Sequence, residues 1–237
     1  MDPKMDIVLV PGLWLDASSW DLVVPLLEKA GHRARPLTLP GLESADVDRS
    51  QVGLADHVAA VAAAIDEADG PVVLVGHSLG CGIAGCALDA RVDAVAKVVY
   101  VGGWPGAAGK PLAEGFPTDG AELPPMPWDE LDEADVRDLD RASFEAILRP
   151  SPARLTTDVV RLTDERRYHV PALFVCPEYT AEQLQTWVAD GEASVREIPK
   201  ITSVSYADVP TGHWPQLTRP EELAAAILAF AGDRDAS

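Results

Sequence analysis

A serine between two glycines is the residue of this chain best placed for covalent chemistry. Ser78 lies in Gly76-His77-Ser78-Leu79-Gly80, directly after the apolar run 72–75 and at the start of the small-residue stretch 79–88. A strand that reverses sharply into a helix strains its middle residue and leaves room only for glycine on either side. The helix start also offers free N–H groups to negative charge. We expect Ser78 to be a nucleophile; a glycine-rich turn without chemistry is the alternative.

A serine hydroxyl needs a base within hydrogen-bond reach, and the chain has five histidines. His213 follows the last predicted strand, in Pro210-Thr211-Gly212-His213-Trp214-Pro215. Open α/β sheets carry their chemistry in loops after the carboxyl ends of strands. We therefore expect His213 to be the base, with a buried structural histidine as the alternative. The other four histidines are expected to have no catalytic role. We expect His32 at a helix end and His57 on a helix face. His77 should point away from Ser78, and His169 lies at the entry of a strand, the wrong end for catalysis.

Acyl transfer also requires two N–H donors aimed at the oxygen that becomes negatively charged. The backbone N–H of Leu79, directly after Ser78, is the first candidate. The second is the N–H of Leu13, in the loop Val10-Pro11-Gly12-Leu13-Trp14 after the first apolar run, where glycine allows a close backbone approach. An ordinary Pro-Gly turn is the alternative for that loop.

The elements that must position these groups alternate between short apolar runs and helical patterns. The runs indicate strands at 7–10, 33–39, 72–75, 95–101, 172–175 and 204–209. The helical patterns lie at 20–30, 54–68, 79–88, 181–189 and 220–230. Strands this apolar are buried on both faces. The sequence therefore predicts a three-layer α/β/α fold with a mostly parallel sheet of about six strands.

Residues 104–169, called the insertion below, break this alternation with many Pro, Asp and Glu residues and scattered aromatic ones. We expect the insertion to form a cap over the carboxyl ends of the strands, with residues 1–103 and 170–237 as the core. A long surface excursion without function is the alternative. Four tryptophans are expected to line a substrate pocket, although such residues are equally often packing residues: Trp14, Trp104, Trp128 and Trp214.

Composition narrows the classes of function. The chain has 237 residues and a formal net charge of −19, which disfavours nucleic acid and membrane partners. Its three cysteines show neither a metal spacing nor a disulfide framework. The sequence contains no run of 18 apolar residues. We expect a cytoplasmic, soluble protein that acts on a small molecule without a metal; the oligomeric state is not readable from the sequence.

Together these segments resemble the α/β-hydrolase superfamily and, within it, the small esterase and hydroxynitrile-lyase branch. The likeness lies in Val10-Pro11-Gly12-Leu13-Trp14, in Gly76-His77-Ser78-Leu79-Gly80, and in Gly212-His213-Trp214 with Pro220-Glu221-Glu222-Leu223. It covers nearly the whole chain outside the insertion and implies a cofactor-free hydrolase with a helical cap and without the first hairpin. Gly12 and Trp214 replace the threonine and lysine of hydroxynitrile lyases, which argues against cyanohydrin cleavage. Ser78 excludes the aspartate nucleophile of haloalkane dehalogenases.

The resemblance also implies an acid four or five residues beyond the penultimate strand, where this chain has Thr180. Glu178 lies two residues earlier and has a longer side chain. The alternative place after the fourth strand, Gly102-Gly103-Trp104, has no carboxylate, and Asp208 comes too early. We expect Glu178 to orient the imidazole of the base; a solvated loop glutamate is the alternative.

These residues favour the hydrolysis of a small to medium, fairly apolar carboxylic ester through an acyl-enzyme intermediate. A lactonase or thioesterase of secondary metabolism would use the same groups and stays open. A non-catalytic ligand-binding relative is the third reading, because the acid departs from the family pattern.

Overall fold

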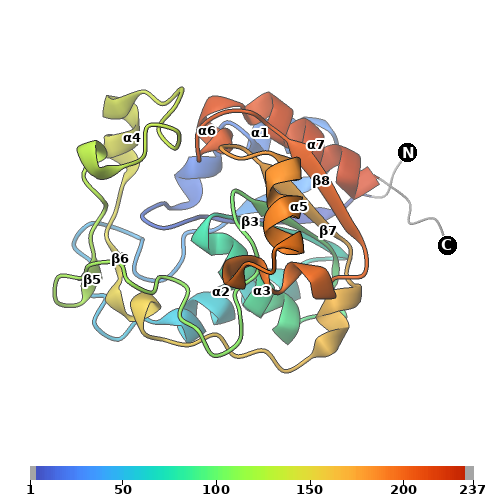
Figure 1. The fold of residues 1–237 in the computed structure, drawn as a ribbon, viewed down its shortest axis with the longest axis horizontal. Coiled ribbons are helices and arrows are strands. Elements are labelled where there is room, and N and C mark those ends of the chain that lie inside the picture. Colours follow the sequence, from blue (N-terminus) through green and yellow to red (C-terminus); the bar gives the residue numbers. More distant parts are fainter. Residues whose placement is uncertain (1–3, 233–237) are drawn as a thin grey trace.

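A parallel sheet forms the centre of the protein, whose computed structural model describes residues 4–232. The described residues form a six-stranded sheet in the order β2-β1-β3-β4-β7-β8, and all neighbouring strands are parallel (Figure 1). The strands are β1 (Asp6–Val10), β2 (Arg33–Pro36), β3 (Val72–His77), β4 (Val95–Val101), β7 (Ala172–Cys176) and β8 (Val204–Asp208). The predicted fold class and all six predicted strands are confirmed.

Helices cover both faces of the sheet because successive strand residues point to opposite sides. Val8 packs into one hydrophobic cluster and its neighbour Ile7 into another, and both side chains are fully buried. The first cluster includes residues of α2 (Leu54–Asp66), α3 (Leu79–Ala90) and α5 (Ala181–Ala189); the second includes residues of α1 (Val24–Lys29) and α7 (Pro220–Gly232). This is the expected three-layer arrangement.

Two predicted elements are shorter than expected, each next to a proline. The helix expected at 20–30 is divided into a 3-10 turn, η1 (Ala17–Trp20), and α1, which has Pro25 in its first turn. Pro25 fits there because the first helical residues need no N–H donor. The strand expected at 33–39 ends at Pro36, on the edge of the sheet, where proline is tolerated.

The insertion is less helical than the family resemblance implies. Among its described residues only α4 (Arg141–Ile147) is an α-helix. The remaining elements are a two-stranded antiparallel pair, β5 (Glu122–Leu123) and β6 (Ser151–Pro152), and the 3-10 turns η2 (Trp128–Glu130), η3 (Ala153–Thr156) and η4 (Glu165–His169). Its many prolines explain this, since proline breaks helix interiors. The predicted core limits at residues 1 and 237 lie outside the described part of the chain.

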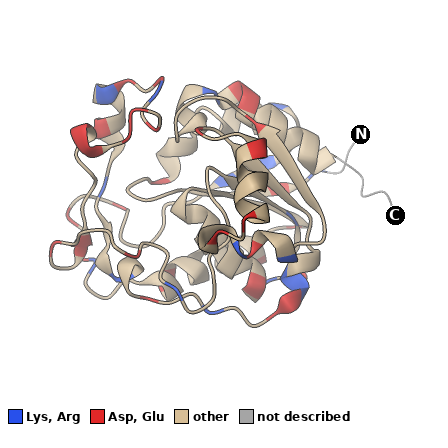
Figure 2. Cartoon of the chain, viewed as in Figure 1, with Lys and Arg blue, Asp and Glu red and all other residues tan. Residues whose placement is uncertain are grey.

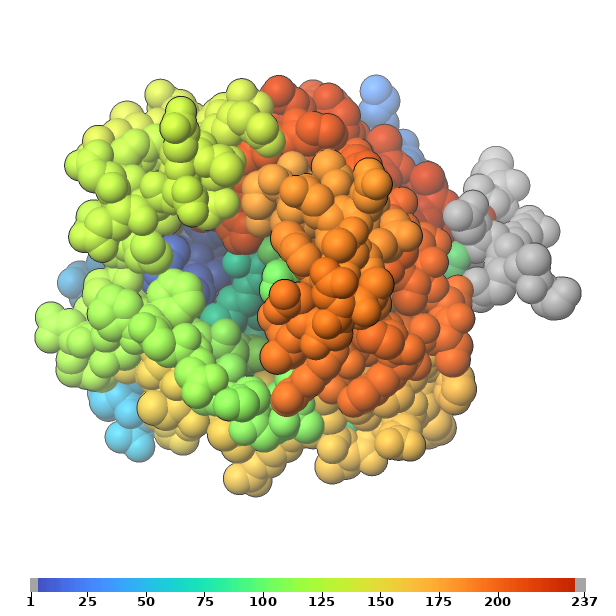
Figure 3. All heavy atoms as spheres, in the orientation of Figure 1, coloured from blue at the N-terminus to red at the C-terminus, as the bar shows by residue number. Residues whose placement is uncertain are grey.

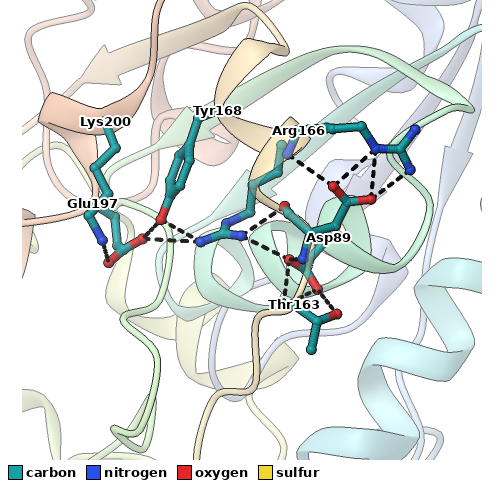
Figure 4. Close-up of polar contacts among 8 residues, drawn as sticks. Asp89, Thr163, Arg166, Tyr168, Glu197 and Lys200 are labelled. Atoms are coloured by element: carbon teal, nitrogen blue, oxygen red, sulfur yellow. Dashed lines mark hydrogen bonds and ion pairs between the residues drawn. The ribbon is translucent and has the colours of Figure 1, made fainter.

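Buried polar contacts attach the end of the insertion to the core (Figure 4). Asp89 of α3 accepts backbone hydrogen bonds from Thr163 and Asp164 and pairs with Arg167 at 3.0 Å. Glu197 accepts a hydrogen bond of 2.6 Å from the Tyr168 hydroxyl. The contacts join η4 to α3 and to the segment that holds η5 (Ala193–Val195) and η6 (Ile198–Lys200).

Acidic and basic residues are interspersed along the ribbon (Figure 2). Several exposed pairs lie at hydrogen-bond distance, for example Arg33 with Asp69 and Arg91 with Asp66, both at 2.7 Å. Within residues 4–232, every helix is too short or too polar to cross a membrane.

Candidate active site

Ser78 lies on a strained bend between β3 and α3. Its backbone has φ 53° and ψ −126°, in a region that non-glycine residues seldom adopt. A Cβ on Gly76 would lie 2.5 Å from the Gly80 carbonyl oxygen, and a Cβ on Gly80 would overlap the carbonyl oxygen of Pro11. Both glycines are therefore required by close backbone packing, as the sequence pattern predicts. The bend raises the serine side chain above the carboxyl edge of the sheet.

A chain of hydrogen bonds joins three side chains at this edge. The Ser78 hydroxyl lies 2.8 Å from Nε2 of His213, although the two residues are 135 positions apart. Nδ1 of His213 lies 2.8 Å from Oε1 of Glu178. Because a carboxylate only accepts, the His213 Nδ1–H donates to Glu178 and Nε2 is free to accept the serine proton. The loops after β3, β7 and β8 supply the three residues.

Two other residues near β7 and β8, Thr180 and Asp208, are not hydrogen-bonded to His213 and make other hydrogen bonds. Thr180 begins α5 as its N-cap, and its side chain accepts a hydrogen bond from the backbone of Gln183 at 3.1 Å. Asp208 accepts a hydrogen bond of 2.7 Å from the backbone of Ala181. The carboxylate that reaches His213 from this part of the chain is that of Glu178.

Electrostatics favour protonation of the base. Burial lowers the pKa of His213, but the hydrogen bond and charge of Glu178, together with the charge of Asp135, outweigh it and hold the pKa above its usual value. The groups that surround the ring therefore stabilise the imidazolium that would form when the serine loses its proton.

A second histidine supports the loop that carries the base. The Nε2–H of His77 donates to the carbonyl oxygen of His213 at 2.8 Å, and its Nδ1 accepts from the amide of Gln216 at 3.2 Å. Burial and the nearby His213 lower the pKa of His77 to about 3, so this ring stays neutral. Its place next to Ser78 in the sequence gave no signal of this contact.

The two residues expected to supply backbone N–H donors lie at the cleft beside the serine. Leu13, Leu79 and Ser78 all line it. In residues 4–232, neither the Leu13 nor the Leu79 N–H has a hydrogen-bond acceptor within the protein. A Cβ on Gly12 would lie 3.0 Å from the Cβ of Ser78, so the loop passes directly against the serine. The pair can donate to an oxygen on a carbonyl carbon attached to Ser78.

The cleft above these groups has a volume of about 890 Å³. Figure 3 shows the hollow between the insertion and the segment that contains α5. Its walls include Leu112, Phe116, Trp104, Tyr179 and Trp187. The rings of Tyr179 and Trp187 lie 5.2 Å apart, and Trp104 is 6.3 Å from Tyr179. The walls suit an apolar ligand with an aromatic part.

Of the four tryptophans expected in the pocket, Trp104 lines the cleft. The other three are placed elsewhere, which corrects that expectation. The Trp14 indole donates to the Leu123 carbonyl at 3.2 Å, Trp214 packs on the ring of Phe144 at 4.5 Å, and Trp128 borders a separate hollow beside α4. Tyr179, Trp187 and Phe116 line the cleft but were not predicted. Only Tyr179, next to Glu178, had a sequence signal that could have indicated it.

One group of three potential metal ligands occurs within the part of the chain that the structure describes. Ligand atoms of Asp135, Glu178 and His213 all lie within 4.8 Å of one another. Both ring nitrogens of His213 already lie at hydrogen-bond distance from Ser78 and Glu178. We therefore interpret the group as a charge cluster around His213, in which Glu178 is hydrogen-bonded to the ring and Asp135 lies nearby.

Comparison with known proteins identifies the family of this chain. The model of the alpha/beta hydrolase family matches residues 7–226. A pyrethroid hydrolase of Sphingobium wenxiniae is 33% identical over 97 residues, which are 40% of this chain and only 35% of that relative's length.

Solved structures match over almost the full chain. The crystal structure of a pyrethroid hydrolase from Sphingobium faniae has a TM-score of 0.70 at 24% identity and covers 97% of this chain and 98% of its own. An extracellular alpha/beta-hydrolase from a Paenibacillus species has a TM-score of 0.77 at 18% identity, with 98% of this chain and 100% of its own covered. At these identities the structural likeness supports the fold.

Proposed function

Because this chain belongs to the alpha/beta hydrolase family, we propose that it is a serine hydrolase of small to medium, apolar carboxylic esters. The observation that carries the proposal is the chain of two 2.8 Å hydrogen bonds from Ser78 through His213 to Glu178. It lies at the floor of a cleft whose lining includes apolar and aromatic side chains together with charged ones such as Lys110 and Arg196. Esterase-type names among the matched proteins, including two pyrethroid hydrolases, add support.

In the first half-reaction the Ser78 oxygen bonds to the carbonyl carbon of the ester while its proton passes to Nε2 of His213. The carbonyl oxygen takes the negative charge and accepts hydrogen bonds from the Leu13 and Leu79 N–H groups. Glu178 stabilises the imidazolium. The bond to the alcohol oxygen then breaks, and that oxygen takes the proton from His213. This leaves the acyl group on Ser78.

In the second half-reaction a water molecule attacks the acyl carbon and gives its proton to His213. The bond between Ser78 and the acyl carbon breaks, and the serine oxygen regains the proton. The products are an alcohol and a carboxylic acid. Every proton transfer in the two half-reactions passes through His213, and no redox step is involved.

The insertion acts as a cap in this proposal. Among its contacts with the core, two involve loops beside the serine: the Trp14 N–H donates to Ser151 Oγ at 2.9 Å, and the His213 N–H donates to the Asp135 carbonyl at 2.8 Å. The insertion also contributes Leu112 and Phe116 to the cleft. A cap in this position shields the acyl-enzyme from bulk water and selects the shape of the ester.

A small-molecule substrate and a cytoplasmic location complete the proposal. The three cysteines are free and buried, and burial raises the pKa of Cys86 and Cys176 to about 12. Unpaired thiols are typical of reducing compartments. The net charge of −19 disfavours nucleic acid as a partner.

A substrate-class screen tests the function. Wild type and Ser78→Ala are compared on p-nitrophenyl esters of increasing acyl length, on pyrethroid esters, on lactones and on thioesters. We expect turnover of esters by wild type, and a loss of at least about 10³-fold in the variant. Preference for lactones or thioesters would reassign the substrate class. Equal rates in the two proteins would contradict the proposal, and binding without turnover would favour the non-catalytic reading.

A further inference from the structure

A second carboxylate lies beside the proposed base and comes from the insertion. A carboxylate oxygen of Asp135, one of Glu178 and a ring nitrogen of His213 are all within 4.8 Å of one another. The Asp135 backbone is fixed in place as well, because its carbonyl oxygen accepts the His213 N–H at 2.8 Å. Asp135 is thus held against both the backbone and the ring of His213.

The neighbouring residues of the insertion clasp the same loop. The Arg137 guanidinium donates to the Thr211 carbonyl oxygen. Asp138 accepts from the Thr211 hydroxyl at 3.3 Å and pairs with Arg219 at 2.9 Å. A Cβ on Gly212 would lie 2.6 Å from the Arg137 carbonyl oxygen and would also overlap that of Asp135. Only glycine allows this approach, so the position of Asp135 is set by several contacts.

The carboxylate of Asp135 contributes to the electrostatics of the His213 ring. Burial raises the pKa of Asp135, the His213 imidazole lowers it, and the charges of Glu178 and Asp132 raise it again. The charge of Asp135 in turn raises the pKa of His213. His77, whose ring centre is 5.2 Å from that of His213, stays neutral because burial lowers its pKa to about 3. The two carboxylates therefore face one imidazole without a competing cation in the cluster.

We propose that Asp135 is a positioning residue that stabilises the His213 imidazolium together with Glu178 and partly replaces it when Glu178 is neutralised. The proposal rests on the proposed function, since it assigns Asp135 a role at the same base. It also gives the insertion a part in positioning the base, because Asp135 belongs to the insertion and contacts both the backbone and the ring of His213.

The first test needs no turnover. NMR titration of the His213 imidazole is recorded for wild type, Asp135→Asn and Glu133→Gln, an equal change of charge on an exposed residue of the same segment. We expect the midpoint of Asp135→Asn to fall by about half a pH unit and that of Glu133→Gln to stay. Asp135→Glu keeps the charge and should keep the wild-type midpoint. Coincident midpoints of Asp135→Asn and wild type would overturn the proposal, as would an equal fall in Asp135→Glu.

The second test is a double-mutant cycle on ester turnover. Asp135→Asn alone should lose about threefold in kcat/KM, and Glu178→Gln about 10²-fold. The double variant should lose on the order of 10⁴-fold, more than the product of the two. A loss equal to that product would overturn the replacement role. Absence of turnover in wild type would instead refute the proposed function and leave the titration to decide on Asp135.

Discussion

Glu178 reaches His213 from two positions before Thr180, and its Oε1 lies 2.8 Å from Nδ1 of the imidazole. Thr180 lies where the family resemblance implies the acid, but it begins α5 in a capping box with Gln183. The strand β7 ends at Cys176, so only residues 177–179 separate it from Thr180, the N-cap of α5. From position 178 the glutamate side chain reaches Nδ1 of His213 at 2.8 Å.

Removing the charge of Glu178 should impair chemistry more than binding. Glu178→Gln keeps the shape of the side chain but weakens the stabilisation of the imidazolium, so kcat should fall on the order of 10²-fold with KM nearly unchanged. Steady-state kinetics on an activated ester measure this. Glu182→Gln, an equal charge change at an exposed position of α5, serves as control. Unchanged turnover of Glu178→Gln would remove this residue from the mechanism.

The rate should depend on the ionisation of His213. The base accepts a proton only when it is neutral, and the surrounding carboxylates hold the pKa of His213 above its usual value. Thus kcat/KM should fall as the pH drops through a midpoint above about 6.5. His77, with a pKa of about 3, adds no second step in this range. A pH–rate profile measures the midpoint; a value well below 6.5 would contradict the electrostatic description.

The loop before Leu13 should tolerate no side chain at Gly12. A Cβ there would lie 2.8 Å from Nδ1 of His77 and 3.0 Å from the Cβ of Ser78. Gly12→Ala should displace the Leu13 N–H and lower kcat on the order of 10²-fold. Gly70→Ala, where a Cβ meets nothing within 4 Å, is the matched control. Equal kinetics of the two variants would show that the loop does not hold the oxyanion.

The buried pair of Asp89 and Arg167 should contribute to stability rather than to chemistry. Asp89→Ala removes the 3.0 Å partner of the buried Arg167, leaving Glu197 at 3.8 Å as its nearest carboxylate, and removes the acceptor of the Thr163 N–H. It should lower the free energy of unfolding by about 3 kcal/mol. Asp93, whose side chain is 83% exposed in its pair with Arg166, is the comparison: Asp93→Ala should change it by less than about 1 kcal/mol. Denaturant titrations followed by circular dichroism give both values. A loss of the same size in both variants would argue against the anchoring role.

The sequence was informative where local pattern determines the structure. The buried strands such as β3 and the glycines around Ser78 follow from apolar runs and steric limits that a few neighbouring residues impose. The contact of Ser78 with His213 was also expected, because the carboxyl ends of parallel strands meet at one edge.

The contacts that were missed depend on packing between distant segments. Asp135 lies in a charge-rich stretch, and nothing local marks it as the residue that meets His213. The indole of Trp14 was expected in the pocket, yet its N–H finds a buried carbonyl acceptor at Leu123. Aromatic residues occur in the core and in pockets equally often. Whether a given ring lines the cleft therefore depends on how the insertion packs, and the many prolines of the insertion leave few regular elements that could be predicted.

Reaction with a fluorophosphonate probe, followed by intact-protein mass spectrometry and peptide mapping, tests the activated serine most directly. We predict one adduct per chain, located on Ser78, with faster labelling as the pH rises through the midpoint of His213. Ser78→Ala should stay unlabelled. A folded wild-type protein that forms no adduct, or one that is labelled at another residue, would contradict the account.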